Sequence, residues 1–249
     1  MKRKIFGLLL IVVAIMGISR NVFAEEEIFY TTPNGIELTE EEYRFLTTFF
    51  SEAYPDIMTE EEYERYVEED LFHTEYTIRR TPVMAMNPFG NSIQSTYHED
   101  SMKYVQIGSA CSDTHCINSL MATWTGSPSE RSWDVIGAYL LNVSLISHDT
   151  TYIYSTDGIT YYTNLKTASN GIGNSVKLPT IGENMVIKMV FTTTKNGHIF
   201  GTYQHSMSYN TLAVSQYYNF SLGGYGDVLS FYGPAANLFD GMAGVDIAV

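Results

Sequence analysis

The chain has 249 residues, of which 45% are hydrophobic and 14% aromatic, and its 28 acidic and 14 basic residues give a net charge of −14. This balance argues against nucleic acid as a partner, because phosphate binding depends on clustered lysine and arginine. A chain of this size and composition buries a hydrophobic core without outside help.

Residues 1–24 have the pattern of a secretory signal peptide. Three basic residues in the first four positions precede an apolar run over 5–18, and the segment ends on a small residue, Ala24. A membrane anchor is the alternative, but the run is shorter than the roughly 20 apolar residues that span a bilayer. We therefore expect a secreted protein, bacterial in character, whose mature chain begins at Glu25 and has no integral membrane segment.

Residues 25–75 are predicted to form an acidic helical hairpin. The segment holds 17 acidic and two basic residues and repeats the motif TEEEY after twenty positions. In each copy a threonine, Thr39 or Thr59, can cap the first helical turn, and a glutamate three residues later, Glu42 or Glu62, can bond back to the cap. A solvated acidic face is the expected role of these charges, and a cationic partner is the alternative.

Beyond the hairpin, the sequence predicts a linker or packed loop over 76–101 and an all-β domain over 102–249. Apolar and polar residues alternate over 185–194 and 213–222, which is typical of strands with one buried face. The Asn196-Gly197 pair predicts a two-residue hairpin turn. The expected fold class is mainly β, and α+β overall: an antiparallel β-sandwich or jelly roll preceded by the helical hairpin.

Both cysteines lie in the motif SACSDTHC, at Cys111 and Cys116, with His115 between them. A closed zinc site needs four ligands, and this motif supplies three at most. A catalytic thiol needs an activating base, and nothing in the sequence singles one out. We favour a disulfide, which the secretory route allows, and we expect no metal and no cofactor.

Two tryptophans, Trp124 and Trp133, flank the polar loop GSPSER. Indoles beside Arg131 and Asp134 suit a sugar ring, because its apolar face stacks on aromatic rings while charged groups orient its hydroxyls. The alternative is that both tryptophans belong to the core and that the arginine pairs with the aspartate.

A second candidate surface is the tyrosine-rich stretch over 150–163, a predicted hairpin that presents Tyr161 among other tyrosines. Its alternation of tyrosine with serine and threonine also resembles a membrane-inserting strand pair, although an ordinary solvent-facing hairpin has the same pattern.

Catalytic motifs are missing from the sequence: it has no nucleophile elbow, zinc-protease motif, phosphate loop or dinucleotide fingerprint. We assign no catalytic residue and lean away from an enzyme. The expected function is an extracellular or cell-surface binding protein for a glycan or a surface protein. A secreted hydrolase with an inconspicuous carboxylate or histidine site, and a membrane-active or assembling β protein, are the alternatives.

Overall fold

The structure is a computed structural model of the chain, and it describes part of the sequence. The described residues are 27–82, 103–128, 131, 133–149, 151–155, 158–162, 165–168, 170–182, 185–205, 218–220, 229–231 and 243–249. The predicted signal peptide, most of the predicted linker and most of the predicted strand over 213–222 lie outside these residues. Within the described part, no helix is long and apolar enough to cross a membrane.

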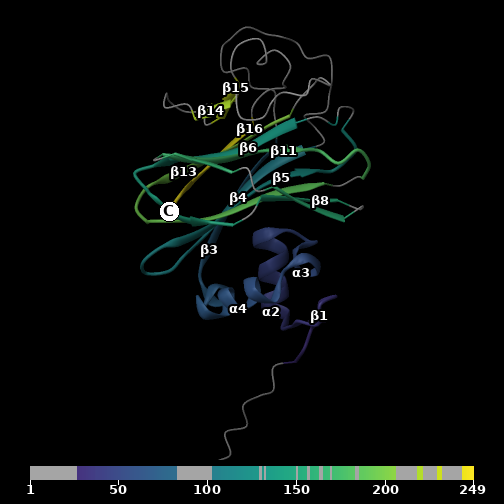
Figure 1. Cartoon of the computed structure of the whole chain (residues 1–249). Coiled ribbons are helices and arrows are strands. Elements are labelled where there is room, and N and C mark those ends of the chain that lie inside the picture. Colours follow the sequence, from purple (N-terminus) through teal and green to yellow (C-terminus); the bar gives the residue numbers. More distant parts are fainter. Residues whose placement is uncertain are drawn as a thin grey trace, which may run out of the picture.

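Two antiparallel sheets stack to form a β-sandwich, which confirms the predicted fold class (Figure 1). The larger sheet, here called the helix-covered sheet, contains β3 (Tyr76–Pro82), β4 (Lys103–Cys111), β5 (Cys116–Trp124), β12 (Val186–Thr193), β8 (Thr151–Ser155) and β9 (Gly158–Tyr162) in that order, with β7 (Leu145–His148) also paired to β12. The five-stranded sheet has the order β10 (Lys166–Ala168), β11 (Gly171–Lys177), β6 (Trp133–Leu141), β13 (His198–Gln204) and β16 (Ala243–Ala248). Two short pairs stand apart: β1 (Tyr30–Thr31) with β2 (Glu37–Leu38), and β14 (Tyr218–Phe220) with β15 (Leu229–Phe231).

The main core lies between the two sheets. Side chains alternate along each strand, so every second residue faces inward. On β12 the inward residues are Ile187, Met189 and Phe191, all fully buried, as the alternation over 185–194 predicts. They pack against apolar residues of the five-stranded sheet such as Ile136 and Ile199.

The Asn196-Gly197 pair does not close a hairpin, so that prediction is wrong. Asn196 has the positive φ of 71° that such a turn requires. However, the strands on either side belong to different sheets, β12 to the helix-covered sheet and β13 to the five-stranded sheet. The backbone amides of both turn residues instead donate to the carbonyl of Val249, at 2.7 and 3.0 Å. A Cβ at Gly197 would lie 2.3 Å from the Leu141 carbonyl oxygen, so this turn between the sheets needs glycine.

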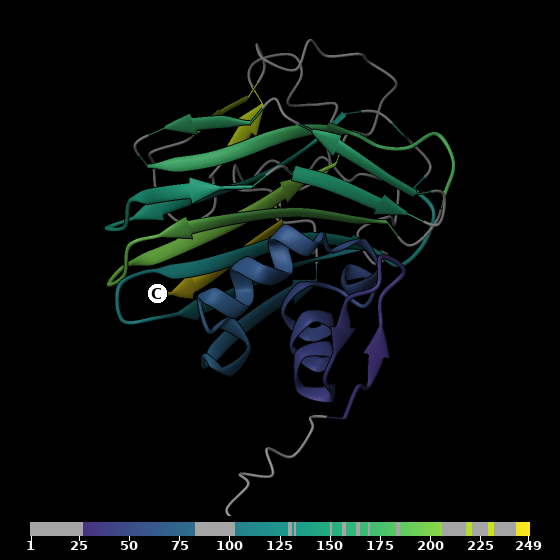
Figure 2. The same cartoon turned by 60° about the horizontal axis from the view of Figure 1, so that its bottom comes forward.

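The acidic N-terminal segment is helical but more divided than a simple hairpin. It contains α2 (Glu40–Phe45), the π-helix η1 (Leu46–Phe50), α3 (Tyr54–Ile57), α4 (Glu60–Glu68) and the 3-10 turn η2 (Leu71–His73). Both predicted capping boxes are present: the Thr39 and Thr59 hydroxyls accept from the Glu42 and Glu62 amides, and each glutamate bonds back to its cap. This helical segment lies against the outer face of the helix-covered sheet (Figure 2).

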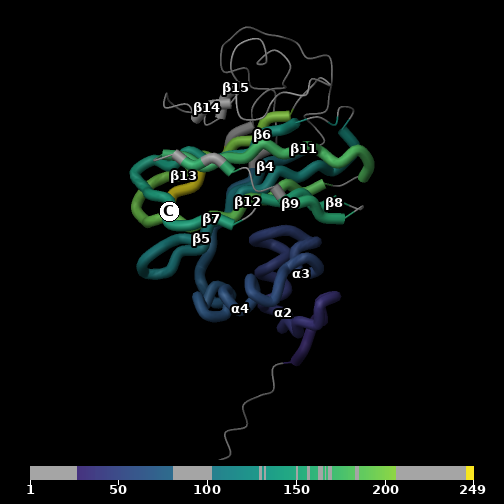
Figure 3. The backbone as a smooth tube through the Cα atoms, viewed as in Figure 1, coloured from purple at the N-terminus to yellow at the C-terminus, as the bar shows by residue number. Residues whose placement is uncertain are grey.

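A second hydrophobic cluster joins the helical segment to the sheet. Phe49, Phe50 and Tyr66 of the helices are fully buried and share this cluster with sheet residues such as Ile117 and Val190. The tube view follows the chain from these helices into the body (Figure 3). The passage runs through β3, which pairs with β4 along its whole length, so residues 76–82 belong to the sheet rather than to the predicted linker.

Candidate functional site

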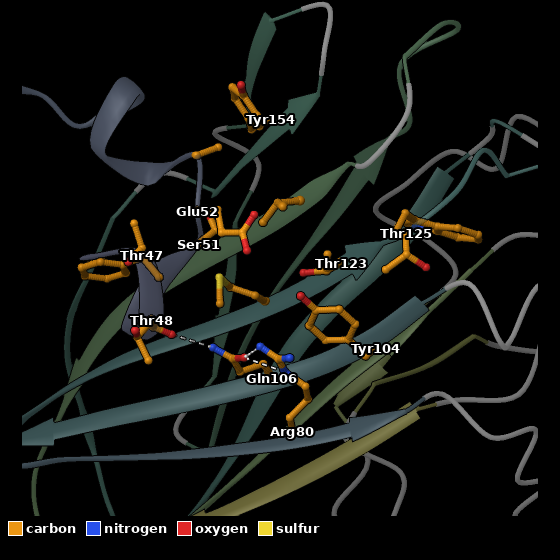
Figure 4. Close-up of a pocket in the computed structure, with 15 residues that line it drawn as sticks. Thr47, Thr48, Ser51, Glu52, Arg80, Tyr104, Gln106, Thr123, Thr125 and Tyr154 are labelled. Carbon is orange, nitrogen blue, oxygen red and sulfur yellow. Dashed lines mark hydrogen bonds between the residues drawn. The ribbon is translucent and has the colours of Figure 1, made fainter. Parts of the chain in front are cut away.

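A groove of about 660 Å³ opens on the helix-covered sheet beside the helical segment (Figure 4). Its floor follows one row of facing residues across four strands, in the order Tyr104, Thr123, Val186 and Tyr154. Residues in register on one face of a sheet lie side by side, which is why these distant positions meet. The wall is the stretch from η1 to α3, with Thr47, Thr48, Ser51 and Glu52 among its lining residues.

Arg80 of β3 is held in place at one side of the groove. Its Nε and Nη2 atoms donate to the side-chain oxygen of Gln106, at 3.0 and 2.7 Å, and the guanidinium lies 4.4 Å from the centre of the Tyr104 ring. Gln106 is 1% exposed, and its amide nitrogen donates to the Thr48 carbonyl at 3.3 Å. Because the arginine side chain has only donors, the oxygen of the Gln106 amide must face Arg80, and the amide nitrogen must face Thr48.

The rest of the lining is rich in hydroxyl groups. Thr47, Thr48, Ser51, Thr123 and Thr125 are five hydroxyl-bearing residues of the lining, and Tyr104 and Tyr154 add two aromatic rings. The Thr47 hydroxyl itself donates to the Tyr43 carbonyl at 2.9 Å. Glu52 is the one carboxylate among the described residues that line the groove. Hydroxyls and a carboxylate exchange hydrogen bonds with a polyhydroxylated ligand, while tyrosine rings cover its apolar face.

Two of the site residues predicted from the sequence, Trp124 and Asp134, belong to the core, and Trp124 also borders the groove. Both are fully buried. The indole nitrogen of Trp124 donates to the Tyr203 hydroxyl at 2.9 Å, and that hydroxyl donates to Asp134. His205 also bonds to Asp134, at 3.0 Å, and its ring packs edge-on against the indole. This buried network links β5 of one sheet to β6 and β13 of the other. Trp124 is therefore in the core, as the alternative interpretation of the sequence expected.

Trp133 and Arg131 lie outside β5, the strand that contains Trp124. Trp133 begins β6, in the other sheet, and is partly exposed. Arg131 donates to the carbonyls of Pro179 and Gly182, at 2.8 and 2.6 Å, and to the Ser127 hydroxyl at 2.6 Å. These bonds tie two connecting segments together, so both terminal nitrogens of Arg131 are bonded within the protein.

The predicted hairpin over 150–163 is present as β8 and β9, and it places Tyr161 at a second cavity. Tyr161 is 56% exposed and faces Tyr152 across the hairpin. The cavity, also about 660 Å³, lies between this hairpin and α4, and its wall is acidic. Its lining residues are Thr59, Glu61, Glu62, Glu64, Arg65, Glu68, His148, Asp149, Tyr152 and Tyr161.

An ion pair closes the contact of α4 with the sheet at this cavity. Arg65 donates from both terminal nitrogens to Asp149, at 2.8 and 2.9 Å, and the bonded carboxylate raises the pKa of the guanidinium. Asp149 lies between β7 and β8, the two strands that pair in succession with the same side of β12. The short connection between these strands therefore supplies the carboxylate that binds α4 to the sheet.

Lys188 is buried under the helical segment with rings around its amine. The side chain is fully buried, and Nζ lies 3.5 Å from the Phe50 ring centre, 3.2 Å from that of Tyr54 and 5.5 Å from that of Tyr152. The amine has no hydrogen-bond partner among the described residues. Burial lowers the pKa of Lys188 below that of a free lysine, against the opposing charges of Glu62 and Asp149.

Cys111 and Cys116 form the predicted disulfide, across the turn between β4 and β5. Both thiols are consumed by the bond, so the zinc and thiol-nucleophile alternatives are excluded for this pair. His115 bonds to neighbouring hydroxyls of the turn and lies 3.6 Å from a Glu69 carboxylate oxygen.

Of the residues that line the groove, the sequence analysis had singled out Trp124 and, within the predicted hairpin, Tyr154. Arg80 lay in a predicted linker, and Tyr104 and Gln106 lay in an unremarkable apolar strand. The sequence did contain one signal for this site: Tyr104 and Gln106 are two positions apart on a strand, so their side chains lie on the same face of the sheet. Their partner across the ladder could not be known until β3 was placed.

Comparisons with known proteins give no family. No protein-family model and no curated protein sequence matches the chain. Among solved structures, the KRT10-binding region domain of the pneumococcal serine-rich repeat protein PsrP matches over 52% of this chain and 85% of its own, at 11% identity and a TM-score of 0.33. The enzymatically active domain of tailspike protein 4 from bacteriophage CBA120 matches over 50% of this chain and 18% of its own, at 12% identity and a TM-score of 0.22. Both likenesses are distant, so the site has to be interpreted from its own geometry.

Proposed function

We propose that the protein is an extracellular binding protein that holds a glycan in the groove beside the helical segment. The observation that carries this proposal is the lining of the groove, in which five hydroxyl side chains and two tyrosine rings surround a space of about 660 Å³. Ligand sites are concave and combine apolar walls with a few placed polar groups. The groove therefore takes the place of the tryptophan-flanked loop as the candidate glycan site.

Extracellular location is supported by two independent features. The signal-peptide pattern over 1–24 predicts export, and a Cys111–Cys116 disulfide is typical of oxidising compartments.

Binding without turnover is favoured over hydrolysis. Glycoside hydrolysis generally uses two carboxyl groups on either side of the scissile bond. Glu52 is the one acid that lines the groove within the described part of the chain. The other acid–histidine contact of interest, between Asp134 and His205, is sealed in the core and cannot reach a polymer.

The test is a binding screen of the mature protein, Glu25 to Val249, against soluble and insoluble glycans, with released fragments assayed in the supernatant. We expect binding without release. Tyr154→Ala should weaken binding about tenfold because it removes an aromatic face from the floor. Tyr161→Ala, the matched tyrosine at the second cavity, should leave binding unchanged.

Thermal melts of both variants check that the fold is intact. Equal losses in the two variants would place the ligand away from the groove. Fragment release would show an enzyme, and binding to surface proteins alone would replace the glycan with a protein partner.

A further inference from the structure

The charge on Arg80 is the feature of the groove that the proposed function leaves unused. The Arg65 guanidinium is paired with a carboxylate, and so is that of Arg44, which lies 2.7 Å from Glu40. Arg80 instead bonds to the neutral amide of Gln106, and no carboxylate among the described residues lies within ion-pairing distance of it. Within the described part of the chain its positive charge therefore lines the groove without a bonded carboxylate, and Glu52 is the acid of the same lining.

The arginine is also held ready to bind. Two of its five N–H groups are used by Gln106, which leaves three. Stacking on Tyr104 and the bond from buried Gln106 to the Thr48 carbonyl restrict the side chain before any ligand arrives. A guanidinium with free, fixed N–H groups matches the two oxygens of a carboxylate, and prior ordering reduces the entropy lost on binding.

From these contacts we propose that the groove recognises an acidic glycan, with Arg80 binding the carboxylate of a uronic or nonulosonic acid residue. This inference rests on the proposed function and names its ligand class. The neighbouring lining agrees with one carboxylate on a polyhydroxylated ligand, because the threonine and serine hydroxyls bond neutral groups. Glu52 accepts from ligand hydroxyls and repels a densely sulfated polymer. Gln106 is a positioning residue in this arrangement, since it acts through the arginine.

A carboxylated peptide end is the competing source of the same group. The observations favour the sugar, because the groove offers side-chain hydroxyls and tyrosine rings along its floor. Its floor is made of paired strands, whose backbone groups are already bonded within the sheet and cannot take up an extended peptide.

The experiment compares acidic oligosaccharides with their own methyl esters, which keep the size and hydroxyls but remove the charge. Oligogalacturonides and sialyl-oligosaccharides are titrated against the mature protein by calorimetry. We expect the free acids to bind about 10-fold to 100-fold more tightly than the esters, as for a charge-assisted pair. Arg80→Gln should abolish this preference, and Gln106→Leu should reduce it.

Arg79→Gln is the matched control. It removes the same charge from the adjacent residue of β3, whose side chain points to the other side of the strand. We expect Arg79→Gln to retain the preference for the acid. If both variants lose it equally, the effect is general electrostatics and the assignment to Arg80 is wrong.

The remaining outcomes separate this inference from the proposed function. Equal binding of acids and esters by the unmodified protein overturns the carboxylate assignment and leaves glycan binding intact. Binding of a free-acid peptide over its amide, with no glycan bound, overturns both. Thermal melts of Arg80→Gln and Gln106→Leu show whether a loss reflects unfolding, and Arg80→Lys, which keeps the charge without the planar fork, should restore part of the preference.

Discussion

Lys188 illustrates how a single residue can oppose the stability of the fold that contains it. Its amine is fully buried against the rings of Phe50 and Tyr54 and has no hydrogen-bond partner among the described residues. Ring faces attract a cation, but burial without a partner favours the neutral amine, so the folded-state pKa lies below that of free lysine. At a pH between the folded-state and unfolded-state pKa values, the unfolded chain therefore binds a proton that the folded chain does not.

We therefore expect Lys188→Met to raise the free energy of unfolding by about 1–3 kcal/mol at neutral pH, because it keeps an unbranched apolar stem and removes the buried amine. The sign with pH follows from the lowered pKa. In the native protein the contribution of Lys188 to stability improves as pH rises from its folded-state pKa toward the unfolded-state value of 10.5. It is most unfavourable below that window.

Urea unfolding at several pH values measures both effects as differences between the variant and the native protein. The exposed Lys177 provides the control, since Lys177→Met should change stability by less than about 0.5 kcal/mol. A less stable Lys188→Met protein would show that the ring contacts hold a charged amine at net benefit.

At the scale of the element, the first turn of α2 is stabilised by the capping box that the sequence predicts at Thr39 and Glu42. The Thr39 hydroxyl accepts from the Glu42 amide at 3.3 Å, and the Glu42 carboxylate accepts from the Thr39 amide at 2.8 Å. The same carboxylate accepts from the Tyr63 hydroxyl of α4 at 2.9 Å, so the start of one helix is tied to the next.

Thr39→Ala should lower the free energy of unfolding by about 1 kcal/mol, because the Glu42 amide in the first turn loses its side-chain acceptor. Thr39→Ser keeps the hydroxyl and should cost a few tenths of that. Chemical denaturation of both variants decides the point, and an equal loss for serine and alanine would mean that packing of the threonine methyl, rather than capping, stabilises this end.

At the scale of the whole molecule, the helical segment and the sandwich share one buried cluster, so we expect them to unfold together. Both tryptophans lie in the sandwich and none lies in the segment over 27–75. Tryptophan fluorescence therefore follows the sandwich, while the far-ultraviolet helical signal follows the segment. Their urea transitions should coincide, as for a two-state domain.

A substitution at Gly108 of β4 tests whether the helical segment and the sandwich unfold together. A Cβ at this position would lie 3.0 Å from the Phe49 ring of η1, so Gly108→Ala requires that ring to shift by a few tenths of an ångström. We expect a loss of about 1–3 kcal/mol, typical of an overpacked core, with both signals shifted to the same midpoint. Two separated transitions would show that the helical segment is an independent unit.

Local patterns were sufficient where the chemistry was local. The capping boxes at Thr39 and Thr59, the hairpin containing Tyr161 and the disulfide between Cys111 and Cys116 all depend on groups within a few residues of one another, and all are present. Period-two alternation likewise predicted the inward face of β12, because a strand alternates its faces wherever it lies.

The features that the sequence did not predict depend on pairing between strands that are far apart in the chain. The turn at Asn196 has the predicted positive φ but joins two sheets. The strands on either side of it, β12 and β13, pair with strands from other parts of the chain rather than with each other. Trp124 and Trp133, nine positions apart in the sequence, fall on different sheets. Asp134 belongs to a buried hydrogen-bond network.

By itself, then, the sequence determined an acidic, mainly β chain with a capped helical start and a disulfide-closed turn, and it predicted export. Only the tertiary structure placed Arg80 opposite Gln106, and Tyr104 in one row with Tyr154, to form the groove. The physical reason is register: which residues meet across a sheet depends on strand order, and strand order is set by burial of the whole chain.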